Sequence, residues 1–245
     1  MKNALKLDGR GGVVTGDIGC YTMALGPAGY FQLKTVQAMG SGTGLASGFG
    51  KLGAMGFKQP VLAVCGDSTF FHAAIPALIN GVYNRSNFTM LILDNSATAM
   101  TGFQPHPGTG TNAMGEPTAA VDIEAVCRAL GVRVEVTDPF DLKGTKEKLL
   151  DLMADEGGVR VLISRRKCAL VRARQEKAAY RMRVDSDRCL GESCGCNRLC
   201  TRVFQCPGLA WDSASSVARI DEMVCSGCGV CADICPASAI IREAA

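Results

Sequence analysis

The chain has 245 residues, of which 47% are hydrophobic and 20% are charged, and its formal net charge is +3. This hydrophobic fraction excludes a disordered chain, and the length allows one large domain with a small one. No run approaches 18 apolar residues, and residues 1–12 carry charges where an export signal needs an apolar stretch. We therefore predict a cytoplasmic protein without a membrane span, and the near-neutral charge balance predicts no nucleic-acid partner.

The first 165 residues alternate short apolar runs with longer segments of helical period. The predicted strands are Gly12–Thr15, Val61–Cys65, Phe88–Leu93, Val132–Val136 and Val159–Ile163. The predicted helices lie near Thr35–Met55, Phe71–Tyr83, Asp122–Leu130 and Asp141–Met153. This alternation predicts a doubly wound α/β fold, in which helices cover both faces of a mostly parallel sheet and ligands bind beyond the carboxyl ends of the strands.

Polar residues follow two of these strands. Asp67 stands at the tip of the run VLAVCG, with Ser68 and Thr69 at the start of the next helix, and Asn95 ends the run FTMLILDN. Carboxylate and carboxamide oxygens suit Mg²⁺, and free amides at a helix N-terminus bind anions. The pair therefore predicts a site for a metal-bound pyrophosphate. The alternative is an ordinary strand-to-helix turn that Asp67 caps.

The basic residues gather between Arg165 and Arg188, where nine Lys and Arg accompany three Asp and Glu. We interpret residues 171–188 as a basic, partly helical linker between a cofactor-binding domain at 1–170 and a small domain at 189–245. A solvated connecting face is one explanation of the charge, and contact with an acidic partner or an anionic substrate is the other.

Nine of the 13 cysteines lie between Cys189 and Cys235. The last four form the Cys-x2-Cys-x2-Cys-x3-Cys-Pro run of bacterial ferredoxins, whose fourth cysteine usually ligates the other cluster of a pair. We therefore predict two [4Fe-4S] clusters in a ferredoxin-like domain, the first held by Cys206, Cys225, Cys228 and Cys231. Cys235 then joins three of the four earlier cysteines, which are Cys189, Cys194, Cys196 and Cys200. One of these is spare, and Cys200 is placed like a third ligand; a zinc site is the alternative.

The motifs of the first domain resemble those of the thiamine diphosphate-dependent 2-oxoacid:ferredoxin oxidoreductases. Gly66-Asp67-Ser68 followed by Asn95 is similar to their metal and pyrophosphate motif, with Ser68 in place of the usual glycine, and SATAMTGFQPHPG is similar to their Asn-x5-Thr-Gly-x-Gln loop. The resemblance implies Mg²⁺ ligation by Asp67, Asn95 and the carbonyl of Ala97. It also implies a cofactor site formed by Asp17, Gly19, Cys20, Gly66, Ser68, Thr69, Thr101 and Gly102.

The likeness continues through both cysteine groups, and the chain resembles the carboxyl-terminal portion of the indolepyruvate ferredoxin oxidoreductase large subunits. It implies oxidative decarboxylation of a 2-oxoacid to an acyl-coenzyme A and CO₂, with the electrons passing through the clusters to ferredoxin. The pyrimidine-binding domain of that family and its Cys-Pro-x-Cys-Pro-His segment have no counterpart in this sequence. We therefore expect a partner subunit with that domain, a further oxidoreductase subunit, and no catalysis by this chain alone.

Two residues are the candidates for catalysis. Cys20 lies in GDIGCYTM, similar to the family's loop against the thiazolium, and His106 lies in the loop after the metal motif, where a structural role is an equal alternative. An electron-relay subunit and a non-redox thiamine diphosphate lyase are competing functions. The substrate implied by the resemblance is an arylpyruvate such as indolepyruvate, with pyruvate and branched-chain 2-oxoacids left open.

Overall fold

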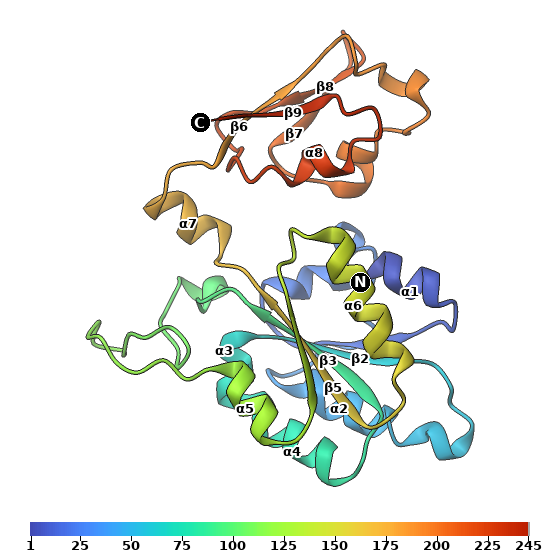
Figure 1. Cartoon of the computed structure of the whole chain (residues 1–245), viewed down its shortest axis with the longest axis vertical. Coiled ribbons are helices and arrows are strands. Elements are labelled where there is room, and N and C mark those ends of the chain that lie inside the picture. The colour runs from blue at the N-terminus through green and yellow to red at the C-terminus, as the bar shows by residue number, and fades with distance from the viewer. Residues whose placement is uncertain (245) are drawn as a thin grey trace. The chain divides into compact units, whose positions relative to one another are not determined.

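The computed structural model describes residues 1–244, and the chain divides into two units, Met1–Cys168 and a second unit from Ala169 onward (Figure 1). The observed boundary lies two residues before the predicted end of the first domain. Within the described residues no helix is both long and apolar enough to cross a membrane.

A five-stranded parallel sheet forms the centre of the first unit. Its strands are β1 (Val13–Thr15), β2 (Val61–Gly66), β3 (Phe88–Asp94), β4 (Arg133–Thr137) and β5 (Val159–Arg165). Their order in the sheet is β1-β2-β3-β5-β4, and each neighbouring pair is parallel. The five predicted strands are therefore confirmed, with ends that differ by one or two residues.

Helices cover both faces of this sheet. Successive strand residues point to opposite faces, so the apolar strands present side chains on both faces for helices to pack against. Ala63 and Cys65 of β2 pack with residues of α2 (Ser41–Phe49), α4 (Ile75–Tyr83) and α5 (Ile123–Ala129). Leu62 and Val64 pack on the other side, against α1 (Lys2–Asp8) and α6 (Leu142–Ala154). The doubly wound α/β fold is thus as predicted.

The predicted helix near Thr35–Met55 is shorter than expected. α2 begins only at Ser41, after Gly40 with φ +81°, and a 3-10 turn, η3 (Leu52–Met55), follows it. Conversely, the helix predicted from Phe71 begins at Asp67 as α3 (Asp67–Thr69) and passes through a π-helical stretch, η4 (Phe70–Ala74), into α4. The left-handed backbone that only glycine adopts easily explains the first difference.

Two antiparallel strand pairs form the sheets of the second unit. β6 (Tyr180–Val184) pairs with β9 (Ile240–Ala244), and β7 (Leu209–Asp212) pairs with β8 (Val217–Ile220). Helical segments η6 (Gly191–Cys194), η7 (Leu199–Phe204) and α8 (Val230–Ile234) each carry one cysteine, and α7 (Ala169–Gln175) begins the unit. Met182, Leu209, Cys231 and Ile240 form its small core.

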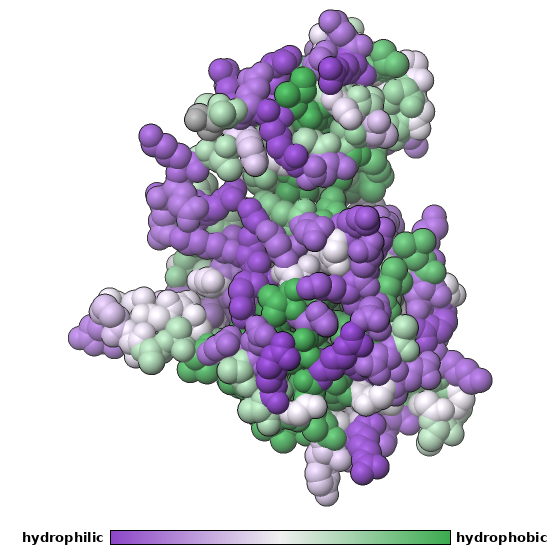
Figure 2. All heavy atoms as spheres, viewed as in Figure 1, coloured by the Kyte–Doolittle hydropathy of each residue, from purple (hydrophilic) through white to green (hydrophobic). Residues whose placement is uncertain are grey.

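The predicted linker over residues 171–188 requires a correction. It contains most of α7, which is largely hydrophilic in the view of Figure 2, but also β6, which belongs to the second unit. In β6 the side chain of Met182 is buried between Arg181 and Arg183, which pair with Glu222 and Glu243. This alternation of buried and exposed residues is typical of a half-buried strand. The prediction used the number of basic residues in the segment and did not consider the alternation.

Candidate functional site

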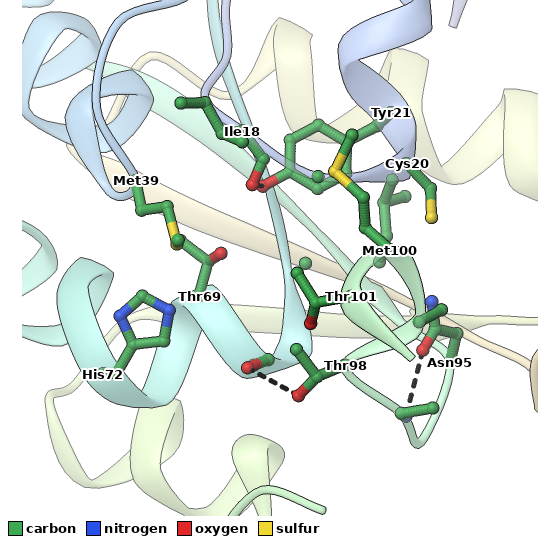
Figure 3. Close-up of a pocket in the computed structure, with 16 residues that line it drawn as sticks. Ile18, Cys20, Tyr21, Met39, Thr69, His72, Asn95, Thr98, Met100 and Thr101 are labelled. Carbon is green, nitrogen blue, oxygen red and sulfur yellow. Dashed lines mark hydrogen bonds between the residues drawn. The ribbon is translucent and has the colours of Figure 1, made fainter. Parts of the chain in front are cut away.

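Three strand ends meet at one edge of the first sheet, because β1, β2 and β3 are neighbours and run parallel. The loop after β1 carries Asp17 to Cys20, β2 is followed by Asp67, and β3 is followed by Asn95. A cavity of about 300 Å³ lies between these loops (Figure 3). Its position, beyond the carboxyl ends of the strands, is where α/β sheets bind ligands.

Most of the predicted cofactor and metal residues line this cavity, namely Gly19, Cys20, Gly66, Ser68, Thr69, Asn95, Ala97 and Thr101. Four predicted residues do not line it, namely Asp17, Asp67, Gly102 and His106. The exposed Cys20 lies across the opening from Met39 and His72 (Figure 3). The predicted residues of all three loops therefore line the same cavity. The buried side chains of Asp17, Asp67 and His106 lie outside its lining.

Asp67 is fixed beneath the floor of the cavity. Its carboxylate is 2% exposed, and it accepts the backbone N–H of Ser68 at 2.8 Å through Oδ1 and that of Asn95 at 3.0 Å through Oδ2. One carboxylate thus joins the ends of β2 and β3. Asn95 in turn accepts the backbone N–H of Ala97 at 3.0 Å, which shapes the following loop.

The oxygen atoms around Asp67 suit a hard cation. A carboxylate, the Asn95 carboxamide and the Ala97 carbonyl are the kinds of ligand that Mg²⁺ accepts together with water and phosphate oxygens. Nowhere in residues 1–244 do three or more His, Cys, Asp or Glu side chains already form a metal site. A cation bound here would have one charged protein ligand, a set that suits Mg²⁺ better than zinc.

His106 lies behind Asp67 and outside the cavity. The imidazole is buried and packs on the Phe71 ring, with 5.6 Å between the ring centroids. Its Nδ1 accepts the backbone N–H of Gly108 at 3.1 Å, so the neutral ring carries its proton on Nε2. Nε2 lies 3.1 Å from Oδ2 of Asp67 but is not aligned as a hydrogen-bond donor, and it has no hydrogen-bond partner. The structure thus gives His106 contact with the metal motif and none with the cavity.

Asp17 is buried in the loop after β1. Its carboxylate accepts the hydroxyl of Tyr21 and the backbone N–H of Gly40, the latter at 2.9 Å. Burial raises the pKa of Asp17, and these two hydrogen bonds oppose the increase. Asp17 therefore connects the Cys20 loop to the start of α2 and presents no free oxygen to the cavity.

Hydroxyl groups line one part of the cavity. Thr98 donates to the Ser68 hydroxyl at 2.9 Å (Figure 3), and Thr101 donates to the Gln104 side chain at 2.6 Å. Hydroxyl groups are among the donors that phosphate oxygens accept.

Sequence reasoning did not identify two sets of residues that line the cavity. The first forms an apolar wall and consists of Ile18, Tyr21, Met39, Leu93, Ala99 and Met100. The second is polar and consists of His72 and Thr98. Tyr21 and Thr98 stand within motifs that the sequence analysis used. His72 lies four residues after Ser68 on one helical segment, a spacing that places both on the same side. Met39 precedes Gly40 in a loop, and no sequence signal identified it.

A second cavity, in the second unit, gathers cysteines from distant parts of the sequence. It is lined by Cys189, Cys194, Cys196, Cys200 and Cys235. Of the other four thiols, Cys206, Cys225 and Cys231 pack in the core of this unit. Burial, and then the nearby thiols, raise the pKa of Cys231 to about 12. The cavity brings together the cysteines that the ferredoxin spacing assigns to the second cluster, and within residues 1–244 no three or more His, Cys, Asp or Glu side chains are arranged as a metal site.

Comparison with known proteins identifies both units. Residues 17–163 match the family described as thiamine pyrophosphate enzyme, C-terminal TPP binding domain, and residues 218–241 match a 4Fe-4S binding domain. The solved 2-oxoglutarate:ferredoxin oxidoreductase from Magnetococcus marinus has a similar fold, with a TM-score of 0.55 and 19% identity, over 64% of this chain and 54% of that chain.

Curated relatives are similar along nearly the whole chain. Indolepyruvate oxidoreductase subunit IorA of Pyrococcus horikoshii is 41% identical, over 93% of this chain and 36% of that protein. The subunit IorA of Archaeoglobus fulgidus is 39% identical, over 91% of this chain and 34% of that protein. The chain spans about a third of the length of these relatives, which confirm the resemblance found in the motifs. The chain belongs to the family of thiamine pyrophosphate enzymes, through their C-terminal TPP binding domain.

Proposed function

We propose that this chain is the cofactor-binding and electron-transfer part of a 2-oxoacid:ferredoxin oxidoreductase. One observation carries the proposal, namely that two kinds of site occur on the same chain. The first is a cavity lined by hydroxyl groups, next to the hydrogen-bonded Asp67 and Asn95, and the second is a set of clustered cysteines. A lyase would need the first site but not the second.

The first site would hold thiamine diphosphate through Mg²⁺. Asp67, Asn95 and the carbonyl of Ala97 would be the protein ligands of the metal, and the hydroxyls of Ser68 and Thr69 would bind the diphosphate. When bound, thiamine diphosphate supplies an electron sink for the decarboxylation of a 2-oxoacid. The chain's own contribution is to fix the diphosphate end and to leave Cys20 at the opening.

The second site would carry the electrons away. Cys206, Cys225, Cys228 and Cys231 would hold one [4Fe-4S] cluster, and Cys235 with three of the four earlier cysteines would hold the other. A soluble ferredoxin would accept the electrons, and coenzyme A would accept the acyl group. The name of the IorA relatives favours indolepyruvate as the substrate, ahead of pyruvate and branched-chain 2-oxoacids.

The active site would be completed by a partner subunit that carries a pyrimidine-binding domain. Large apolar side chains at the first cavity are exposed, with Ile18 at 40%, Met39 at 49% and Met100 at 56%. Apolar surface around a polar site marks an interaction surface. The protein would thus act as a hetero-oligomer with a further oxidoreductase subunit.

The test is viologen reduction dependent on a 2-oxoacid, measured for the purified chain and for the complex obtained by co-expression with the subunits of neighbouring genes. We expect activity only in the complex, with thiamine diphosphate, Mg²⁺ and coenzyme A, and the highest kcat/KM for indolepyruvate. Full turnover by the chain alone would contradict the proposal that a partner subunit completes the active site. A complex that accepts electrons but decarboxylates no 2-oxoacid would support an electron-relay subunit instead.

A further inference from the structure

A surface cavity of the second unit has one of the proposed cluster ligands in its wall. The cavity has a volume of about 260 Å³, and Cys225 is among the residues that line it, together with Tyr180, Arg181 and Glu222. The cavity beside the other cysteine group is much narrower, at about 20 Å³. The loop that would hold the first cluster is therefore the one that borders a hollow wide enough to receive another molecule's side chains.

Exposed apolar side chains stand directly before Cys225. Met223 is 95% exposed and Val224 is 50% exposed. Both are held on a turn, because the Asp221 carboxylate accepts the backbone N–H of Met223 at 3.0 Å. The carbonyl of Asp221 accepts the N–H groups of Val224 at 3.2 Å and of Cys225 at 2.8 Å. The turn thus presents two apolar side chains to solvent and ends at the cluster ligand.

Tyr180 adds an aromatic ring to this apolar surface from β6. It is 39% exposed, and its backbone N–H donates to the carbonyl of Gly227 at 3.2 Å. Its ring lies so close to Gly229 that a Cβ there would come within 2.9 Å of it. Gly227 and Gly229 flank Cys228 in the sequence, so the ring packs on the backbone of the cysteine loop.

The charged residues that line the cavity are paired with each other. Arg181 Nη2 lies 3.0 Å from Glu222 Oε1, and both side chains are exposed. Such a surface pair contributes little attraction, so a partner bound here would be held mainly by apolar contact. Exposed apolar side chains with a polar rim mark a protein interaction surface, and Met, Tyr and Arg are enriched at such surfaces.

We propose that Tyr180, Met223 and Val224 form the docking surface for the soluble electron-carrier protein that this chain reduces, and that the electrons leave through the cluster ligated by Cys225. A carrier bound there would lie against the loop that holds this cluster. One electron passes from the reduced cluster, which returns to its oxidised state, to the oxidised centre of the carrier, and no bond breaks. Interfaces between redox partners are small, which suits a patch of three apolar side chains. The inference rests on the first cluster of the proposed function.

Binding of an oxidised [4Fe-4S] ferredoxin to the co-expressed complex tests the surface without catalysis. Met223→Glu should weaken the binding measured by calorimetric titration roughly 10- to 150-fold, the range that burial of one methionine side chain provides. Met55→Glu is the matched control, because Met55 is 84% exposed but belongs to the first unit, and it should bind ferredoxin as the parent does. Equal affinities of Met223→Glu and the parent, or no binding to the parent, would overturn the proposal.

The kinetics of two acceptors identify the cluster through which the electrons leave. With a 2-oxoacid as donor, Met223→Glu should raise the KM for ferredoxin about 10-fold or more and leave the reduction of methyl viologen, a small acceptor, unchanged. Leu190→Glu changes a side chain that is 57% exposed beside Cys189 of the other group, and it should alter neither reaction.

Two results of these kinetics would overturn the assignment. One is a raised KM for ferredoxin in Leu190→Glu alone, which would place the exit at the other cysteine group. The other is loss of a subunit from the Met223→Glu complex, which would show that a subunit covers the surface. No viologen reduction by the parent complex would instead refute the proposed function, and the calorimetric titration would still test the docking surface.

Discussion

Replacing Asp67 by asparagine separates metal binding from folding more cleanly than replacement by alanine. The carboxylate is 2% exposed and accepts two backbone N–H groups, from Ser68 at 2.8 Å and from Asn95 at 3.0 Å. Alanine would leave both amides without an acceptor, at about 1–3 kcal/mol each. Asparagine keeps the shape and one acceptor oxygen, so it should lower the free energy of unfolding by only about 1–3 kcal/mol.

The effect on the cofactor should be larger than the effect on folding. Asp67→Asn removes the only charged protein ligand of the proposed Mg²⁺ site. If the lost charge-assisted interaction contributes about 1.5–3 kcal/mol, Mg²⁺-dependent retention of thiamine diphosphate should weaken roughly 10- to 150-fold. Calorimetric titration with thiamine diphosphate, at fixed Mg²⁺, measures this change. The visible spectrum of the clusters should not change, since they belong to the other unit.

Asp94 provides the matched control for this experiment. It also lies at the end of β3, but its carboxylate accepts from the Arg165 Nε at 2.7 Å and does not line the cavity. Asp94→Asn should therefore bind thiamine diphosphate as the parent does. Equal cofactor affinity in Asp67→Asn and in the parent would refute the assignment of the metal motif, and equal losses in both variants would show that the effect is general instability.

Three further substitutions, one of them with a matched control, test the surroundings of the site. His106→Asn should weaken metal-dependent cofactor binding by at most roughly 10-fold, because its Nε2 lies near Asp67 without a hydrogen bond, and unchanged binding would show that the contact with Asp67 has no role. Ser68→Ala, which loses the hydroxyl bonded to Thr98, should weaken cofactor binding about 2- to 12-fold in the same titration. Gly40→Ala should lower the free energy of unfolding by about 2–4 kcal/mol in urea denaturation, because its Cβ would lie 2.8 Å from that of Ala73 at φ +81°. Gly56→Ala, at φ +89° with nothing within 4 Å, should cost only the backbone strain of about 1–2 kcal/mol, and equal effects of the two would contradict the packing argument.

The sheet and one edge of the site could be predicted from sequence because each depends on local pattern. Apolar runs gave the strands to within two residues, and polar residues directly after β2 and β3 had to meet once those strands were neighbours. The 4Fe-4S binding domain could be predicted because few other sites share the spacing of its cysteines.

The remainder depends on packing between segments that are distant in sequence. The loop after Asn95 returns behind Asp67, so His106 contacts Asp67 and does not line the cavity, a choice that the sequence left open. Met39 reaches the cavity from a loop without a motif, and Gly40 delays α2 through a conformation that hydrophobic period does not reveal. The strand β6 was not predicted because its basic residues are typical of a solvated linker, and Met182 is its only buried side chain.

The most direct test of the whole account is a single turnover without an external acceptor. The anaerobic complex, loaded with thiamine diphosphate, Mg²⁺ and coenzyme A, is mixed with indolepyruvate, and cluster reduction is followed by electron paramagnetic resonance. The account predicts reduced [4Fe-4S] clusters in the parent and none in the complex that contains Asp67→Asn. Clusters that stay oxidised while the 2-oxoacid is decarboxylated, or that become reduced equally in the variant, would contradict it.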